Sequence, residues 1–108
     1  MNNPTNLFKI AYEQLAIKLQ LIVGNNNIIL IEIPKLLSGV MLPYNINMNT
    51  RVSEYNNIIE QIVTERGLIS LKMNYSDQDF YDGVHLNEYG SQNFGRQIAE
   101  HILRLRNL

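Results

Sequence analysis

Ile28-Ile29-Leu30-Ile31-Glu32-Ile33 is a short, nearly continuous run of branched apolar residues, and Pro34 ends it. Such a run is typical of a strand that is covered on both faces, as in a parallel sheet between layers of helices. A second short strand is predicted at 68–71, and the residues between the two strands have helical spacing. The order strand, helix, strand predicts a right-handed parallel βαβ unit.

Helical spacing also flanks the two strands. In 7–23 an apolar face is expected to pack on the core, and its residues are Phe8, Ala11, Leu15, Leu19 and Ile22. In the helix predicted at 51–66 the corresponding residues are Val52, Tyr55, Ile59 and Ile62. A last helix follows 72–86, and its apolar face carries Phe94, Ile98, Ile102 and Leu105.

The order αβαβα predicts the α/β class, as a partial doubly wound (flavodoxin-like) three-layer fold with two parallel strands and three helices. We find no internal repeat, so residues 1–108 are expected to form a single partial domain. Two strands leave edges and faces that three helices cannot fully cover, which indicates that part of the fold is missing before the first helix.

The edge of the predicted strand 28–33 carries no lysine, and only Pro34 discourages pairing along it. We therefore expect self-association through this edge, as a two-fold homodimer that extends the sheet, or pairing with a strand from a partner.

The composition excludes several classes of function. Nine Lys and Arg against ten Asp and Glu give a net charge of -1, which argues against a nucleic-acid surface. No apolar run approaches the roughly 18 residues of a membrane span. Cysteine is absent, which excludes disulfides and thiolate catalysis. This absence fits a reducing cytosol but leaves the compartment open, and no cofactor is expected.

The segment Tyr81-Asp82-Gly83-Val84-His85-Leu86-Asn87 carries the candidate chemistry. It follows the last predicted strand, and α/β sheets place their sites beyond the carboxyl ends of strands. Asp82 and His85 are close enough for the carboxylate to accept a hydrogen bond from the imidazole. In a nucleophilic hydrolase the aspartate of such a pair orients the histidine, and the histidine removes the proton of a serine hydroxyl. Alternatively, Asp82 only caps a turn, and spacing by itself favours this interpretation.

The context of this segment resembles the carboxyl-terminal half of the SGNH (GDSL-type) hydrolase family of lipases and acylhydrolases. In that family an Asp-x-x-His block, followed by an Asn and a Gly before the last helix, supplies two members of a Ser-His-Asp triad. The resemblance implies that Asp82 orients and that His85 is the general base. It also implies a structural role for Tyr55-Asn56, and an ester-type small molecule or an acylated sugar as substrate.

The chain departs from the family in its nucleophile, because it has no Gly-Asp-Ser motif and no Gly-x-Asn-Asp block. Its serines lie in other contexts and are Ser38, Ser53, Ser70, Ser76 and Ser91. The resemblance therefore implies that the serine belongs to an amino-terminal segment, either a separate piece or part of a longer native product, and that the isolated chain is nearly inactive. The alternative is a non-catalytic binding or assembly module derived from a hydrolase fold, in which His85→Ala would leave function intact.

The acidic residues around this segment could also be considered as metal ligands, and they are Asp77, Asp79, Asp82 and Glu88, with His85. Their spacing fits no calcium loop, because the obligatory glycine is absent. We expect no metal here, and interpret these residues as a solvated acidic loop.

Overall fold

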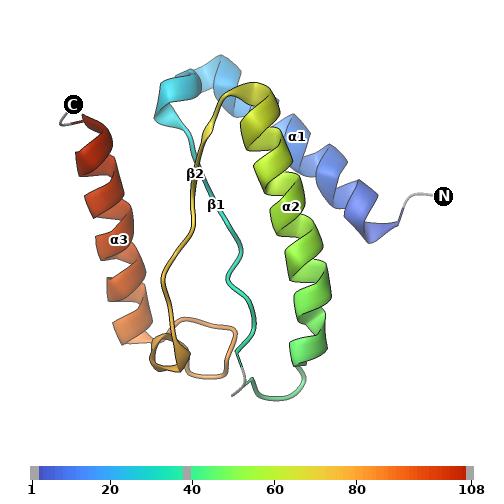
Figure 1. Ribbon diagram of the computed structural model, residues 1–108, viewed down its shortest axis with the longest axis vertical. Coiled ribbons are helices and arrows are strands. Elements are labelled where there is room, and N and C mark those ends of the chain that lie inside the picture. The colour runs from blue at the N-terminus through green and yellow to red at the C-terminus, as the bar shows by residue number, and fades with distance from the viewer. Residues whose placement is uncertain (1–2, 38–39, 107–108) are drawn as a thin grey trace. The chain divides into compact units, whose positions relative to one another are not determined.

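The computed structural model describes residues 3–37 and 40–106 and confirms an α/β chain with three helices and two parallel strands (Figure 1). The elements in chain order are α1 (Pro4–Val23), β1 (Ile29–Ile31), α2 (Asn49–Arg66), β2 (Ile69–Leu71) and α3 (Glu88–Arg106). Short 3-10 turns precede β1 and α2, and a third, η3 (Asp77–Asp79), precedes the candidate site. None of the helices in the described part is both long and apolar enough for a membrane span.

The elements belong to two compact units. Unit one comprises the described parts of Met1–Ile33 and Asn49–Lys72, and therefore holds α1, β1, α2 and β2. Unit two comprises the described parts of Pro34–Met48 and Met73–Leu108, and holds η3 and α3. Both members of the Asp82–His85 pair lie in unit two, so the geometry of the site is set within one unit.

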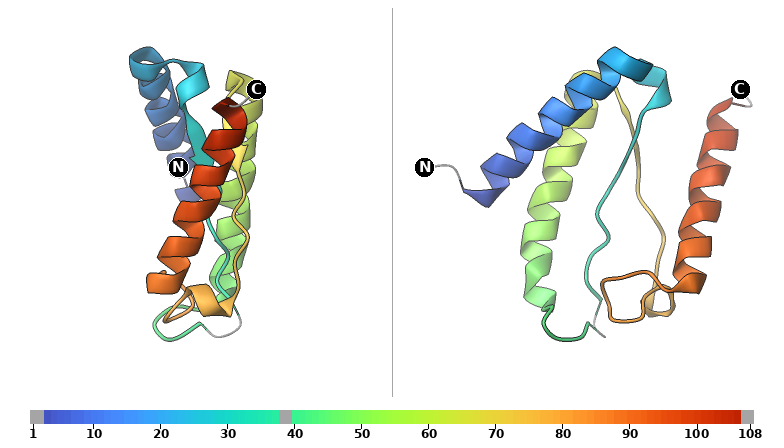
Figure 2. Two further views of the ribbon diagram at one scale, coloured as in Figure 1. Left: turned by 90° about the vertical axis from the view of Figure 1, so that its left-hand side faces the viewer. Right: turned by 180° about the vertical axis from the view of Figure 1, so that it is seen from behind.

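The sheet of unit one is a parallel pair in which Ile29 lies opposite Ile69 and Ile31 opposite Leu71. The ladder continues through the Glu32 N–H, which donates to the carbonyl of Leu71 over 3.1 Å. The two strands run side by side in both figures (Figure 2). They are shorter than the apolar runs that predicted them, because a strand extends only as far as its partner supplies hydrogen bonds.

The core of unit one is centred on α2. Ile59 and Ile62 are fully buried, with 0% of their surface exposed. They pack in one cluster with Ile58 of the same helix, Ala16 of α1 and Leu30 of β1, and with two residues that directly precede the strands, Ile28 and Leu68. The strand 28–33 is thus better covered than expected, because Ile28 and Leu30 are buried and Ile31 is the exposed member.

Helix α1 corrects the prediction of which face is buried. Ala11, Leu15 and Ile22 were expected in the core, yet all three are exposed. Phe8 and Leu19 pack on the core as predicted, and the rest of the inward face is formed by Tyr12 and Ala16. Because α1 is apolar around most of its circumference, hydrophobic spacing does not distinguish one face from another.

Contacts between α1 and α2 run along both helices. The rings of Phe8 and Tyr55 stack with their centroids 4.0 Å apart, and Arg66 Nη1 donates to Gln20 Oε1 over 3.0 Å at the other end. Burial raises the pKa of the Tyr12 hydroxyl on the same face of α1.

Asn56 has the structural role that the resemblance implied. Its side chain accepts from the N–H of Ile33 over 2.7 Å and donates to the carbonyl of the same residue over 2.9 Å. These two bonds satisfy the backbone polar groups of Ile33, where the extended segment leaves the sheet.

Candidate active site

The candidate site is a tight loop in unit two between Phe80 and Leu86, which form an isolated antiparallel bridge. The N–H of Tyr81 donates to the carbonyl of His85 over 3.1 Å and closes the loop. A loop closed at both its ends restricts the backbone of the residues within it, so the side chains of Asp82 and His85 start from defined positions.

Gly83 is the residue that allows this loop to turn and to approach its neighbour. Its φ of +85° lies in the left-handed region, and a β-carbon there would overlap the backbone of Val40. Beside it the N–H of Met41 donates to the carbonyl of Asp82 over 2.9 Å. The long loop after Pro34 is thereby joined to the candidate site.

The structure brings Asp82 and His85 together as predicted. Asp82 Oδ1 accepts from the N–H groups of Val84 and His85 over 2.9 and 2.7 Å. Asp82 Oδ2 lies 2.7 Å from His85 Nδ1. Because a carboxylate only accepts, this contact assigns the proton to Nδ1 and leaves Nε2 as the basic nitrogen. Asp82 therefore both shapes the loop and orients the imidazole.

The electrostatics of Asp82 follow from these contacts. Desolvation by itself would raise the pKa of the Asp82 carboxyl, but the backbone N–H and imidazole of His85, together with the N–H of Val84, lower this pKa to about 2. The carboxylate is consequently ionised throughout the neutral range.

The lowered pKa of Asp82 predicts a pH-dependent contribution to stability. A group whose pKa is lowered by folding stabilises the native state above its unfolded value, here 3.8, and loses this effect as the pH falls toward about 2. The difference in unfolding free energy between the parent and Asp82→Asn should therefore be constant above about pH 5 and shrink as the pH falls further. Urea titrations at a series of pH values measure it, and a difference that does not change would contradict the assignment.

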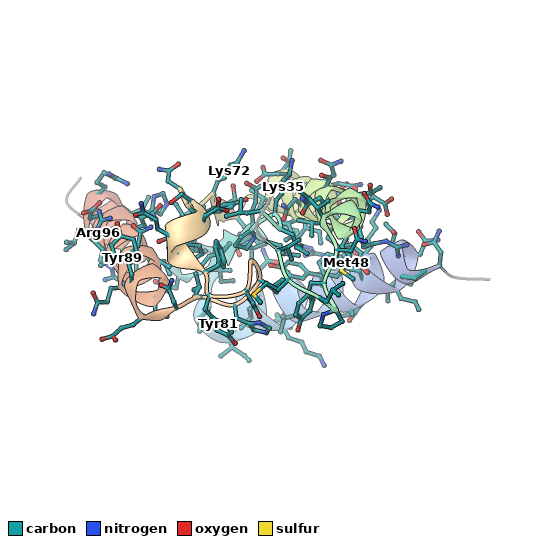
Figure 3. The ribbon with its side chains drawn as sticks, turned by 90° about the horizontal axis from the view of Figure 1, so that it is seen from below. Lys35, Met48, Lys72, Tyr81, Tyr89 and Arg96 are labelled. Carbon is teal, nitrogen blue, oxygen red and sulfur yellow. The ribbon has the colours of Figure 1, made fainter. Side chains whose placement is uncertain are left out.

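Two tyrosines flank the imidazole. The ring of Tyr81 stacks on His85 with centroids 5.7 Å apart and an interplanar angle of 17°. The ring of Tyr44, from the loop after Pro34, meets it edge-on at 5.6 Å. Tyr81 is itself exposed on the loop (Figure 3), and 49% of the His85 side chain is accessible. The imidazole is thus held on two sides and open to solvent.

Asp79 corrects the prediction of a solvated acidic loop, because it is buried with 2% of its surface exposed. Its carboxylate accepts from the N–H of Ser76 over 2.8 Å and from the amide of Asn93 over 3.0 Å. Its carbonyl accepts from the N–H of Asn87 over 2.9 Å. Asp79 therefore attaches η3 to α3, while Asp77 and Glu88 are exposed as expected.

The serines of unit two do not complete a triad in the described part of the chain. Ser76 caps η3 with its hydroxyl, Ser91 lies on the first turn of α3, and neither is hydrogen-bonded to His85. Ser38 lies outside the described residues. The contacts of Tyr44 and Tyr81 with the imidazole were not predicted, although an aromatic residue in each loop that follows a strand was an available signal.

No protein-family model, curated protein sequence or solved structure matches this chain.

Proposed function

We propose that Asp82 and His85 are the orienting carboxylate and the general base of an SGNH-type serine esterase or acylhydrolase. The observation that supports this most strongly is the 2.7 Å contact between Asp82 Oδ2 and His85 Nδ1, in a loop that leaves the ring half exposed. A turn cap alone would need only the backbone N–H bonds to Oδ1, and does not require the second oxygen to meet the imidazole.

In the proposed reaction, His85 Nε2 takes the proton of a serine hydroxyl as the hydroxyl oxygen bonds to the ester carbonyl carbon. The imidazolium then gives this proton to the departing alkoxide as the carbon–oxygen bond breaks. Asp82 keeps the ring in the required tautomer and stabilises its positive charge without itself taking the proton. Tyr44 and Tyr81 restrict rotation of the ring.

The nucleophilic serine is proposed to come from a separate segment that completes the fold. Within the described residues β1 pairs with β2 alone, so its other edge can accept a strand. This edge at 28–33 is where we propose that the serine-bearing segment docks. The proposed substrates are ester-type small molecules or acylated sugars.

Hydrolysis of p-nitrophenyl acetate by the isolated chain tests the assignment of the base. An exposed imidazole accelerates hydrolysis of an activated ester even without a serine, so we expect slow turnover that His85→Ala largely removes. His101→Gln is the matched control, because His85 and His101 are the two histidines of the chain. It should retain the parent rate.

The same assay also tests the proposed source of the serine. We expect a fluorophosphonate neither to label the isolated chain nor to slow it, because its turnover does not pass through a serine. Fluorophosphonate-sensitive turnover would show that the nucleophile lies within this chain. Equal rates for the parent and His85→Ala would instead remove His85 from the role of base and favour a non-catalytic module.

A further inference from the structure

Helix α1 carries two apolar stripes on opposite sides. One stripe packs into the core of unit one and comprises Phe8, Tyr12, Ala16 and Leu19. The other stripe, here called the outer seam, comprises Leu7, Ile10, Ile17 and Leu21, with the polar Gln14 at its centre. At 3.6 residues per turn the two stripes are centred about half a turn apart. The outer seam therefore points away from the core that α1 helps to form.

The outer seam is exposed for most of its length. Leu7 and Ile10 each expose 53% of their surface and Leu21 exposes 83%. In Figure 2 (right) α1 lies over α2, so that α2 covers one side of α1 and leaves the other side free. An apolar stripe of this length on a helix surface is typical of an interaction site.

The spacing of the outer seam is that of a coiled coil. Its members follow one another at intervals of three, four, three and four residues, which places Leu7, Gln14 and Leu21 at a positions and Ile10 and Ile17 at d positions. In this register Glu13 occupies a g position and Lys18 an e position. Neither residue is in an ion pair within the described part of the chain.

We propose that α1 docks in parallel on α1 of other copies of this chain through the outer seam. In a parallel coiled coil a g residue meets the e residue five positions later on the neighbouring helix. Glu13 of each copy therefore meets Lys18 of the next, and the rotational symmetry of the assembly repeats the pair. This charge complementarity identifies a second copy as the occupant of the surface.

An antiparallel arrangement lacks this complementarity. There g residues meet g residues and e residues meet e residues, so Glu13 would lie near Gln20 and Lys18 near Ala11. The parallel arrangement also brings Gln14 of one copy opposite Gln14 of another, where the amides can hydrogen-bond and hold the register. Leucine at a and isoleucine at d favour assemblies of more than two helices, so three or four copies can share the seam.

Sedimentation equilibrium of the chain at micromolar concentrations tests the proposal. We expect the parent to sediment as an oligomer, and the double variant Ile10→Glu/Leu21→Glu to be monomeric or to associate at least an order of magnitude more weakly. Leu42→Glu is the matched control, because Leu42 exposes 92% of its surface but lies in unit two. It should sediment like the parent.

Exchanging the charges of Glu13 and Lys18 distinguishes the proposed parallel coiled coil from unspecific association. Glu13→Lys and Lys18→Glu should each weaken association severalfold, because each places like charges opposite one another. The double variant Glu13→Lys/Lys18→Glu should restore the parent affinity. Circular dichroism of each variant establishes that α1 remains helical.

Three results would overturn the proposal: a monomeric parent, an oligomer that Ile10→Glu/Leu21→Glu leaves intact, or single charge variants that associate like the parent. An oligomer that only Ile31→Lys dissociates would place self-association at the edge of β1 instead of at α1. The proposal does not depend on the proposed esterase function, since none of these variants lies in unit two except the control.

Discussion

Ile62→Ala should lower the free energy of unfolding by about 2–5 kcal/mol. Ile62 is fully buried and packs between the strands and α1, so the substitution removes three carbons and leaves a cavity that the surrounding residues fill only in part. Because a small domain has a total stability of about 5–15 kcal/mol, this loss is a large share of it. Urea unfolding followed by circular dichroism measures the difference.

Leu42→Ala is the control for Ile62→Ala, because Leu42 is almost fully exposed and the variant should change the unfolding free energy by less than about 0.5 kcal/mol. Similar losses in the two variants would contradict the placement of the core on α2. The comparison therefore tests which apolar side chains leave water on folding.

Gly90→Ala should destabilise the chain by about 1–3 kcal/mol or more, as other overpacked sites do. A β-carbon on Gly90 would overlap the carbonyl group of Asp79, which accepts the hydrogen bond from Asn87 at the start of α3. Backbone atoms cannot move aside as the end of a side chain can, so the junction of η3 and α3 would have to shift. Thermal and urea unfolding measure the effect.

Gly95→Ala is the matched control within the same helix. A β-carbon at Gly95 meets nothing within 4 Å among the described residues, and alanine is favoured over glycine in a helix. We expect a gain of about 0.4–1 kcal/mol. If both variants were destabilised alike, the close approach at Gly90 would not be the reason for its glycine.

The sequence predicted the elements of this fold because their local signals agree with one another. The helix that ends at Arg66-Gly67 does so as expected, since Gly67 adopts a φ of +64° that stops the helix. Ile59 and Ile62 were placed in the core from their spacing and are buried there. In α2 the residues on the other face are polar, so the hydrophobic pattern indicates a single buried face.

The inward face of α1 could not be predicted, because its apolar residues do not mark a single face. Leu15 and Ile22 share a helical face with Leu19, yet they are exposed while Leu19 packs on the core. When apolar residues surround a helix, the buried face depends on which side its neighbours occupy, and this is a property of the tertiary structure.

The candidate site was predicted in part. Asp82 and His85 are three residues apart in sequence, so a local turn brings them together and spacing suffices to anticipate the contact. Tyr44 is 41 positions from His85, and its ring contact depends on how the loop after Pro34 returns to the site. The burial of Asp79 also escaped prediction, because its partner Asn93 lies on α3.

The position of the proton on the His85 imidazole is the most direct test of whether Asp82 orients His85 as a general base. A two-bond proton–nitrogen spectrum at neutral pH distinguishes a ring nitrogen that carries a proton from one that does not. We expect neutral His85 to be protonated at Nδ1, with this preference lost in Asp82→Ala, while the His101 signals of the two proteins agree. If His85 were protonated at Nε2, or if Asp82→Ala left its tautomer unchanged, Asp82 would not orient the ring and the pair would not be the base of a hydrolase.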